Sequence, residues 1–271
     1  MKKITLVAFL MFLSVIAFAQ KPVRFGVYVG GVTPFGNLGE GDEIKKTAEY
    51  PLGDIHNWAY INEDGTQGYG DLGFNVGFDV TLNLPAGFGV FGGVDFFYNG
   101  TKSMCLDYFE DLSAAEIAIN PNIKEISTSM PATMNIPVLF GVNYIHNFNN
   151  IVGVWGEAGV GPNFRLISSL VTKTEYLAAI TDPINDVTFD KTTETQKYNS
   201  AVTFGFKIGA GAILWDKMSI GLDFYSLGSA KVEGSYEFKE GDKEITLLDN
   251  KFKDNKAISA SELVIRVGYH F

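Results

Sequence analysis

Histidine and cysteine, two side chains that often carry out catalysis, are few in this sequence, with three His and one Cys. Of the three histidines, only His56 lies in a long predicted loop, where it closely follows Asp54. A hydrolase would need a nucleophile or a positioned water beside such a pair. The nearest candidates by type, Ser103 and Ser168, belong to other predicted loops. The sequence therefore predicts a protein that is not an enzyme, and we assign no catalytic residue.

Metal and cofactor sites are not indicated either. His146 and His270 lack the spacing of metal ligands. The single cysteine, Cys105, excludes a disulfide within the chain and a multi-cysteine zinc site. The acidic segments Gly39–Glu43 and Glu240–Glu244 contain no twelve-residue calcium-binding loop. We therefore expect no metal and no cofactor.

The composition is acidic and rich in glycine and aromatic residues. The 271 residues include 21 Lys and Arg against 31 Asp and Glu, which gives a formal net charge of −10. Because an acidic protein lacks the basic face that binds phosphate, we expect no nucleic-acid partner. The 46% of hydrophobic residues excludes a disordered acidic polymer. With 30 Gly and 14% aromatic residues, the chain favours many strands over a helical bundle.

The N-terminus has the pattern of a secretory signal peptide. Two lysines precede the apolar run Ile4–Phe18, which is shorter than the roughly 20 residues that a transmembrane helix needs. Ala17 and Ala19 form an A-x-A cleavage site. The sequence thus predicts a cleaved signal peptide over residues 1–19 and one mature domain over residues 20–271.

Alternating runs dominate the mature chain. Between Leu72 and Leu84, every second residue is apolar and the residues between them are small or polar. Such a run predicts a strand with one apolar face. It is also long enough for a membrane-crossing strand, which needs about 9–11 residues. The pattern occurs eight times, within residues 23–30, 69–84, 88–98, 135–144, 152–165, 202–214, 218–225 and 262–271.

Short and long connections alternate between these runs. Turn-forming residues lie at Leu84–Gly87, His146–Asn150 and Trp215–Lys217. The other connections are long and span residues 34–68, 99–133, 167–200 and 231–259. Short turns at one rim and long loops at the other are typical of outer-membrane barrels. The sequence predicts an all-β, antiparallel, up-and-down transmembrane β-barrel of eight strands, with short periplasmic turns and long extracellular loops.

Two of the long connections have predicted structure of their own. Apolar residues at helical spacing between Leu106 and Ala118 predict a short amphipathic helix, which either caps the outer mouth or binds a partner. Residues 232–238 and 244–248 predict a hairpin that prolongs the last two barrel strands beyond the membrane. Counting this hairpin within the barrel gives ten strands, which is the alternative to eight. Its Glu and Lys side chains would be costly at the bilayer midplane.

Charged residues at the polar positions of the alternating runs are predicted to face the lumen. Eight strands enclose a bore that side chains can fill, and an unpaired charge there is costly. We expect an ionic network that plugs the barrel, with a gate or proton path as the alternative. Its predicted members are Arg24, Asp79, Asp95, Glu157, Lys207, Asp223 and Arg266, and Asp71 and Glu262 share their parity. Arg165, near the outer rim, is expected to reach water.

Two short motifs add a family resemblance to this pattern. Ile136-Pro137-Val138-Leu139 opens the fourth run, and the chain closes with Tyr269-His270-Phe271. With the signal peptide and the eight runs, they resemble the PorT-like small outer-membrane β-barrel proteins of the Bacteroidetes, and more widely the eight-stranded OmpA/OmpX-type barrels. The resemblance implies a bacterial outer-membrane location within a lipid bilayer. It also implies that Tyr269 and Phe271 form a signal for the barrel-assembly machinery.

The predicted function is therefore a non-enzymatic one at the cell surface. A structural, adhesion or surface-binding role through the long loops would involve an envelope or extracellular protein partner. Three alternatives stay open: a narrow pore for small solutes, an accessory subunit of an outer-membrane secretion complex, and, least favoured, an outer-membrane hydrolase or acyltransferase.

Overall fold

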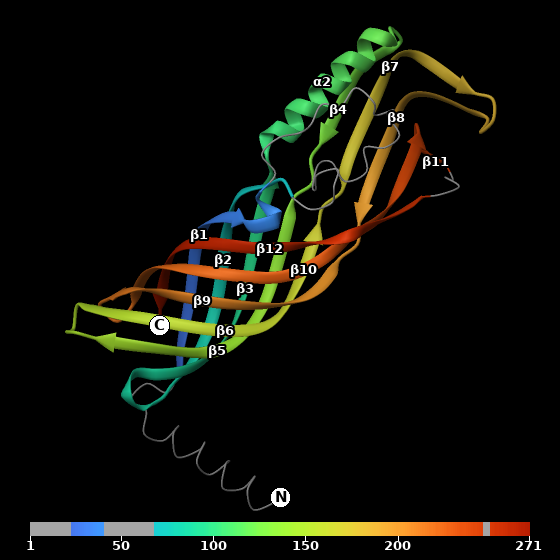
Figure 1. Cartoon of the computed structure of the whole chain (residues 1–271). Coiled ribbons are helices and arrows are strands. Elements are labelled where there is room, and N and C mark those ends of the chain that lie inside the picture. Colours follow the sequence, from blue (N-terminus) through green and yellow to red (C-terminus); the bar gives the residue numbers. More distant parts are fainter. Residues whose placement is uncertain (1–22, 41–67, 246–249) are drawn as a thin grey trace, which may run out of the picture.

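Antiparallel strands make up most of the computed structural model, which describes residues 23–40, 68–245 and 250–271 (Figure 1). Within these ranges the chain forms twelve strands, one α-helix and two short 3-10 helices, η1 (Gly36–Leu38) and η2 (Pro85–Gly87). The predicted all-β, up-and-down antiparallel sheet is confirmed. The predicted signal peptide, with Ala17 and Ala19, lies outside the described residues.

Eight of the strands pair into a closed ring. The ring order is β12-β1-β2-β3-β5-β6-β9-β10, and β10 pairs back to β12. Each of the eight alternating runs lies in one of these strands. Because the last strand pairs with the first, no sheet edge remains open in the ring. The ring strands are β1 (Val23–Phe35), β2 (Gly70–Asn83), β3 (Phe88–Thr101), β5 (Thr133–Asn147), β6 (Val152–Ile167), β9 (Ala201–Leu214), β10 (Met218–Glu240) and β12 (Lys251–His270).

Side chains of the ring strands alternate between the interior and the outer surface. In β2, Phe74, Val76 and Phe78 are exposed, whereas Asn75, Gly77 and Asp79, which alternate with them, are buried. This follows from the period of two in a strand, and similar alternation occurs around the ring. The ring therefore has an apolar outer surface and a partly polar interior, the opposite of a water-soluble protein.

The short connections gather at one rim of the ring. They are η2 and the turns at residues 148–151 and 215–217, as the sequence predicts. The end of the described chain closes at the same rim, where the Phe271 N–H donates to the carbonyl of Phe25 at 2.9 Å.

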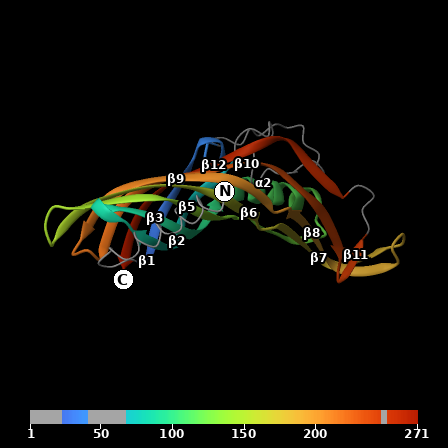
Figure 2. The ribbon, with the colours of Figure 1, turned by 90° about the horizontal axis from the view of Figure 1, so that it is seen from below.

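Part of the ring wall continues beyond the opposite rim as an open curved sheet, which we call the extension. Its strands pair in the order β4-β7-β8-β10, and β12 and β11 both pair with the outer half of β10. β4, β7 and β8 directly adjoin β5, β6 and β9 in sequence, so the extension prolongs the same wall. Seen from below, it lies to one side of the ring (Figure 2). Its added elements are α2 (Ser103–Ile119), β4 (Ile123–Ser129), β7 (Leu170–Asp182), β8 (Val187–Tyr198) and β11 (Lys243–Ile245).

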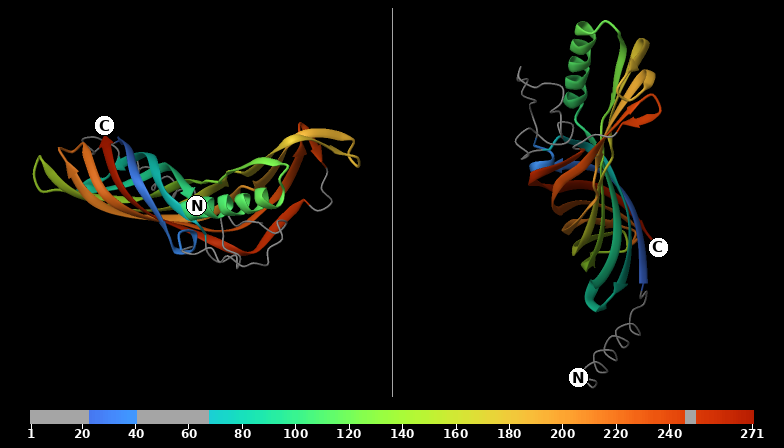
Figure 3. Two further views of the ribbon diagram at one scale, coloured as in Figure 1. Left: turned by 90° about the horizontal axis from the view of Figure 1, so that it is seen from above. Right: turned by 90° about the vertical axis from the view of Figure 1, so that its right-hand side faces the viewer.

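The helix α2 is present where the sequence predicts one, but its position differs from the prediction. It projects away from the ring beside β4 rather than across the ring opening (Figure 3). Tyr108 and Phe109 pack against Leu170 of β7 and Tyr198 of β8. Tyr198 also packs against the buried cluster inside the ring, so α2 covers the face of the extension that continues the ring interior. No helix in the described part of the chain is long and apolar enough to cross a membrane.

The hairpin and the long loop predicted beyond the ring have different outcomes. The hairpin around Lys239–Lys243 is confirmed as far as residue 245, since β11 pairs with the end of β10, and the rest of its predicted second segment lies outside the described residues. The prediction of a long loop over residues 167–200 is wrong, because this segment forms the paired strands β7 and β8. Alternating threonines in both strands favour strand structure and could have revealed it.

Candidate functional site

Four charged side chains form an ion-paired group inside the ring, which we call the central cluster. Glu157 Oε1 lies 2.6 Å from Lys207 Nζ and 2.8 Å from Arg266 Nη2. Arg266 Nε lies 2.9 Å from Asp223 Oδ2. The four side chains come from β6, β9, β10 and β12, and none is more than 9% exposed. Two cations face two anions, so the formal charges balance, which lowers the cost of burying them.

Aromatic rings enclose the two cations. The guanidinium carbon of Arg266 lies 4.2 Å from the ring centre of Trp155 and 4.6 Å from that of Tyr28. Lys207 Nζ lies 4.9 Å from the ring centre of Tyr28 and 5.1 Å from that of Tyr225. Cations over aromatic faces are attracted by the ring quadrupole. The predicted ionic network contains none of these rings, although Tyr28, Trp155 and Tyr225 all lie at inward-facing positions of the alternating runs.

Glycines opposite the cluster provide the space that these groups occupy. A Cβ atom on Gly209 would collide with Oδ1 of Asp223, and one on Gly77 would collide with Cε2 of Tyr28. A larger residue at either position would displace the cluster or its aromatic wall. The glycines at the inward-facing positions therefore leave room for the larger side chains of a packed interior.

Three predicted network members lie in the ring but outside the central cluster. Asp79 and Asp95 are buried, and Asp95 accepts a hydrogen bond from the side-chain amide of Asn75 at 3.4 Å. Arg24 lies at the short-turn rim, where its Nη2 donates to the carbonyl of Asp216 at 3.2 Å. The structure therefore brings together four of the seven predicted residues in direct ion pairs.

The expectation that Arg165 reaches water is wrong, because this side chain is only 2% exposed. It donates to the carbonyls of Gly228 at 2.8 Å and Ile258 at 2.9 Å, and to Asn135 Oδ1 at 3.3 Å. Gly228 has a positive φ at an irregular point in the β10–β12 pairing. Strands of the extension continue the sheet beyond Arg165. The outer rim that the alternating runs predict therefore does not coincide with the end of the sheet.

The remaining predicted residues fall into three groups. Tyr269 and Phe271 lie on the outer surface, with ring centres 5.0 Å apart. The Ser168 hydroxyl accepts a hydrogen bond from the Ala132 N–H at 2.8 Å, which gives it a structural contact. His56 lies outside the described residues. In the part of the chain that the structure describes, no group of three or more His, Cys, Asp or Glu side chains is placed to hold a metal ion.

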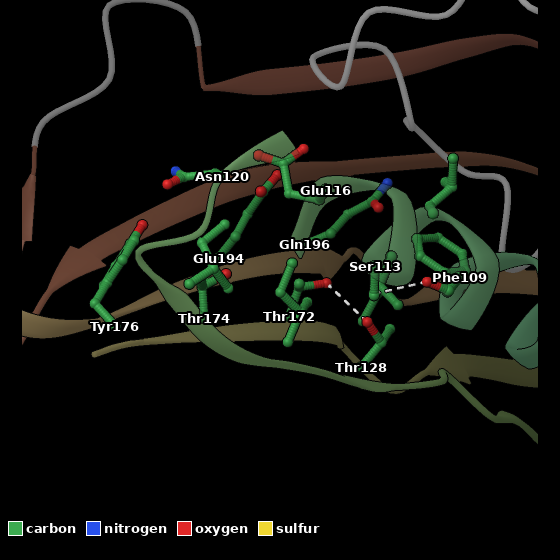
Figure 4. Close-up of a pocket in the computed structure, with 14 residues that line it drawn as sticks. Phe109, Ser113, Glu116, Asn120, Thr128, Thr172, Thr174, Tyr176, Glu194 and Gln196 are labelled. Atoms are coloured by element: carbon green, nitrogen blue, oxygen red, sulfur yellow. Dashed lines mark hydrogen bonds between the residues drawn. The ribbon is translucent and has the colours of Figure 1, made fainter. Parts of the chain in front are cut away.

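A groove of about 230 Å³ lies between α2 and the extension (Figure 4). Phe109, Ser113 and Glu116 line it from α2, because residues three and four apart share one helix face. Thr172 and Thr174 line it from β7, since alternate strand residues share one sheet face. Strands β4 and β8 contribute Ile123, Ile126, Thr128, Glu194 and Gln196, and the lining is completed by Leu112, Asn120, Leu170 and Tyr176. The sequence prediction contains none of this groove, because β7 and β8 are absent from it.

Cys105 is buried at the base of α2, and burial raises the pKa of its thiol to about 12. The thiol is therefore protonated at neutral pH, and a thiolate nucleophile is not formed there.

Comparisons with known proteins give structural likenesses only. No family model and no curated protein matches the chain. The chain is similar to Ail, the attachment invasion locus protein of Yersinia pestis, with 12% identity over 92% of this chain and 98% of that chain and a TM-score of 0.35. It is similar to the outer membrane protein OprG from Pseudomonas aeruginosa, with 12% identity over 92% and 95% of the two chains and a TM-score of 0.39. A major outer membrane protein from Thermus thermophilus has 14% identity over 92% and 99% and a TM-score of 0.40. Identities and TM-scores this low do not define a function.

Proposed function

We propose that this chain is a non-enzymatic bacterial outer-membrane β-barrel. In this proposal the eight-stranded ring spans the bilayer and the extension is a binding surface outside the cell. The observation that carries the proposal is the closed ring with apolar side chains outside and paired charges inside. A lipid bilayer offers no hydrogen bonds to the backbone, so a strand is stable there only in a sheet without edges. The closed β10–β12 pairing meets this requirement.

The outer surface of the ring supports a lipid environment. Phe78, Phe140, Phe204 and Leu222 are examples of large exposed apolar side chains, and they lie on four different strands of the ring. An apolar surface that surrounds a whole ring would be unfavourable in water and is favourable in contact with lipid. The extension differs, since the exposed residues Lys173 and Glu175 of early β7 are charged.

The packed interior supports a plugged scaffold over an open pore. The cavity beside Arg266 and Glu157 has a volume of about 20 Å³, which is room for about one water molecule. The central cluster and its aromatic wall lie at the same level of the ring, where Trp155, Glu157 and Arg266 line this cavity. We therefore favour a structural or surface-binding role over a narrow pore for small solutes.

Three parts of the proposed function, namely export, assembly and family membership, rest on the sequence alone. Export would depend on the signal peptide of residues 1–19, and assembly would use Tyr269 and Phe271 as the signal for the barrel-assembly machinery. Membership of the PorT-like family of the Bacteroidetes belongs to the same proposal. A partner in the envelope or outside the cell would bind at the extension, which also leaves room for a role as a subunit of a secretion complex.

Two measurements on the purified chain test the proposal. On SDS gels, the unboiled chain should migrate differently from the boiled chain, because a closed barrel resists unfolding by detergent. Reconstituted in liposomes, it should not admit sucrose in a swelling assay. A chain that is soluble without detergent and shows equal mobility in both gel lanes would contradict the barrel, and sucrose entry would contradict the plug.

A further inference from the structure

We propose that the groove between α2 and the extension binds one sugar unit of a neutral glycan. The inference uses the proposed function only to place the groove outside the cell. The binding chemistry itself rests on the residues that line the groove.

The lining favours a ligand that is uncharged and rich in hydroxyl groups. Hydroxyl and amide side chains both donate and accept hydrogen bonds, as sugar hydroxyls do. The two carboxylates, Glu116 and Glu194, add acceptors, and no basic side chain belongs to the lining. An anionic glycan would therefore be repelled. The neutral hydrogen-bonding side chains are Ser113, Asn120, Thr128, Thr172, Thr174, Tyr176 and Gln196.

Part of this hydrogen-bonding capacity is unused by the protein. The Thr128 and Thr172 hydroxyls contact each other at 3.5 Å, and the Ser113 hydroxyl donates to the carbonyl of Phe109 at 2.7 Å. Among the described residues, by contrast, the Glu116 carboxylate and the Thr174 hydroxyl have no hydrogen-bond partner. Both face the groove, from opposite walls (Figure 4). They are the groups that a bound hydroxyl would satisfy.

The size and the apolar parts of the groove suit a single sugar ring. Its volume of about 230 Å³ is below the roughly 300–1,000 Å³ of sites for drug-sized ligands. The rings of Phe109 and Tyr176 lie toward opposite ends of the groove (Figure 4). Phe109 is buried, and the half-buried ring of Tyr176 offers an apolar surface to the C–H face of a sugar. A groove that is open along one side admits a sugar within a longer glycan as well as a free one.

The main rival ligand is an amine, which the two carboxylates would also attract. An amine would use charge and little of the neutral lining, and its binding would weaken as salt is added. Sugar binding would depend on the Thr174 hydroxyl and would change little with salt. The two ligand classes are therefore distinguishable by experiment.

Saturation-transfer NMR on the full mature chain in lipid nanodiscs tests this inference. The probes are the methyl glycosides of glucose, galactose and mannose and free N-acetylglucosamine, with spermidine as the amine probe. At least one sugar should give a saturation signal that persists at high salt. Glu116→Gln and Thr174→Val should each weaken its binding about tenfold or more. Matched controls are Glu175→Gln and Thr181→Val, which change the same residue types on β7 outside the groove lining and should leave binding unchanged.

Three results would overturn the inference. They are a lack of signal with every sugar probe, a signal with spermidine alone, and a sugar signal that both groove variants leave intact. The gel-mobility difference between unboiled and boiled chain is measured on the same samples. A chain that keeps this difference but fails to bind sugar refutes the groove proposal alone, whereas a chain that loses it refutes the barrel.

Discussion

Arg266 on β12 contacts Glu157 on β6 at 2.8 Å, although β9 and β10 lie between these two strands in the ring. The contact therefore crosses the interior rather than following the sheet. Glu157 also binds Lys207, and Arg266 also binds Asp223, so one group of charges joins four strands. The ring is stabilised across its interior as well as by its backbone hydrogen bonds.

Arg266→Met should destabilise the ring strongly. The substitution leaves Glu157 and Asp223 buried with one cation instead of two, and breaking a buried pair in this way costs about 3–5 kcal/mol. Urea unfolding in phospholipid vesicles, followed by tryptophan fluorescence, measures the change. Lys124→Met removes an exposed ion pair with Glu175 and should leave the unfolding curve unchanged. Equal curves for Arg266→Met and the wild type would show that the central cluster is hydrated.

Gly209→Ala should disturb the same cluster by steric conflict. The new methyl group would meet the Asp223 carboxylate, which must then move away from Arg266. We expect a loss of about 1–3 kcal/mol, as for other overpacked interiors. The matched control is Gly156→Ala, whose Cβ would have its nearest contact at 3.8 Å. If both variants unfold at the same urea concentration as the wild type, the interior near Gly209 is not packed.

Arg165→Met should loosen the junction between ring and extension. It leaves the buried carbonyl of Ile258 and the half-buried carbonyl of Gly228 without this donor, at a cost of about 1–3 kcal/mol for the buried group. Because both carbonyls lie where the extension begins, amide hydrogen exchange should accelerate there more than at the short-turn rim. Uniform acceleration over the whole ring would contradict a local role.

Cys105 should be unreactive in the folded chain. Burial raises the pKa of its thiol to about 12, so the reactive thiolate is scarce at pH 8 and the sulfur is also inaccessible. Iodoacetamide should leave the folded chain unmodified by mass spectrometry and should modify it fully after unfolding in urea. Rapid labelling of the folded chain would show that α2 detaches from the extension.

The turn between β7 and β8 should lose order in acid. The Asp182 carboxylate accepts hydrogen bonds from the Ile184 N–H at 2.7 Å and the Asn185 side-chain amide at 2.6 Å, and these bonds lower the pKa of Asp182. A carboxyl whose pKa is lowered by folding stabilises the turn fully above its unfolded pKa of about 3.9. That stabilisation is lost as the pH falls through the lower folded pKa.

Amide NMR signals of the turn measure this effect. The Ile184 amide shift should titrate below the ordinary aspartate range in the wild type. Asp182→Asn should abolish the titration, and Asp190→Asn, on the neighbouring strand, should not. A midpoint at or above the ordinary value would contradict the hydrogen bonds.

The local alternation of residues determines by itself which face of each ring strand is apolar. A strand places successive side chains on opposite faces, so Phe74, Val76 and Phe78 had to share one face and Asn75 and Asp79 the other. The same parity predicts that Glu157, Lys207, Asp223 and Arg266 face inward. The helix between Leu106 and Ala118 is also a local feature, and its periodicity is visible without the fold.

Contacts between distant segments are decided only by the tertiary structure. The strand register brings Arg266, rather than Arg24, to Glu157. The alternation of residues shows which face of the sheet a side chain occupies, but it does not show which residues of different strands lie at the same level. The burial of Arg165 depends on carbonyls 63 and 93 residues away in sequence. The groove needs one face of α2 and alternate residues of β4, β7 and β8 together, and their pairing is non-local. Sequence periodicity therefore determined which faces are apolar, and long-range packing decided which side chains meet.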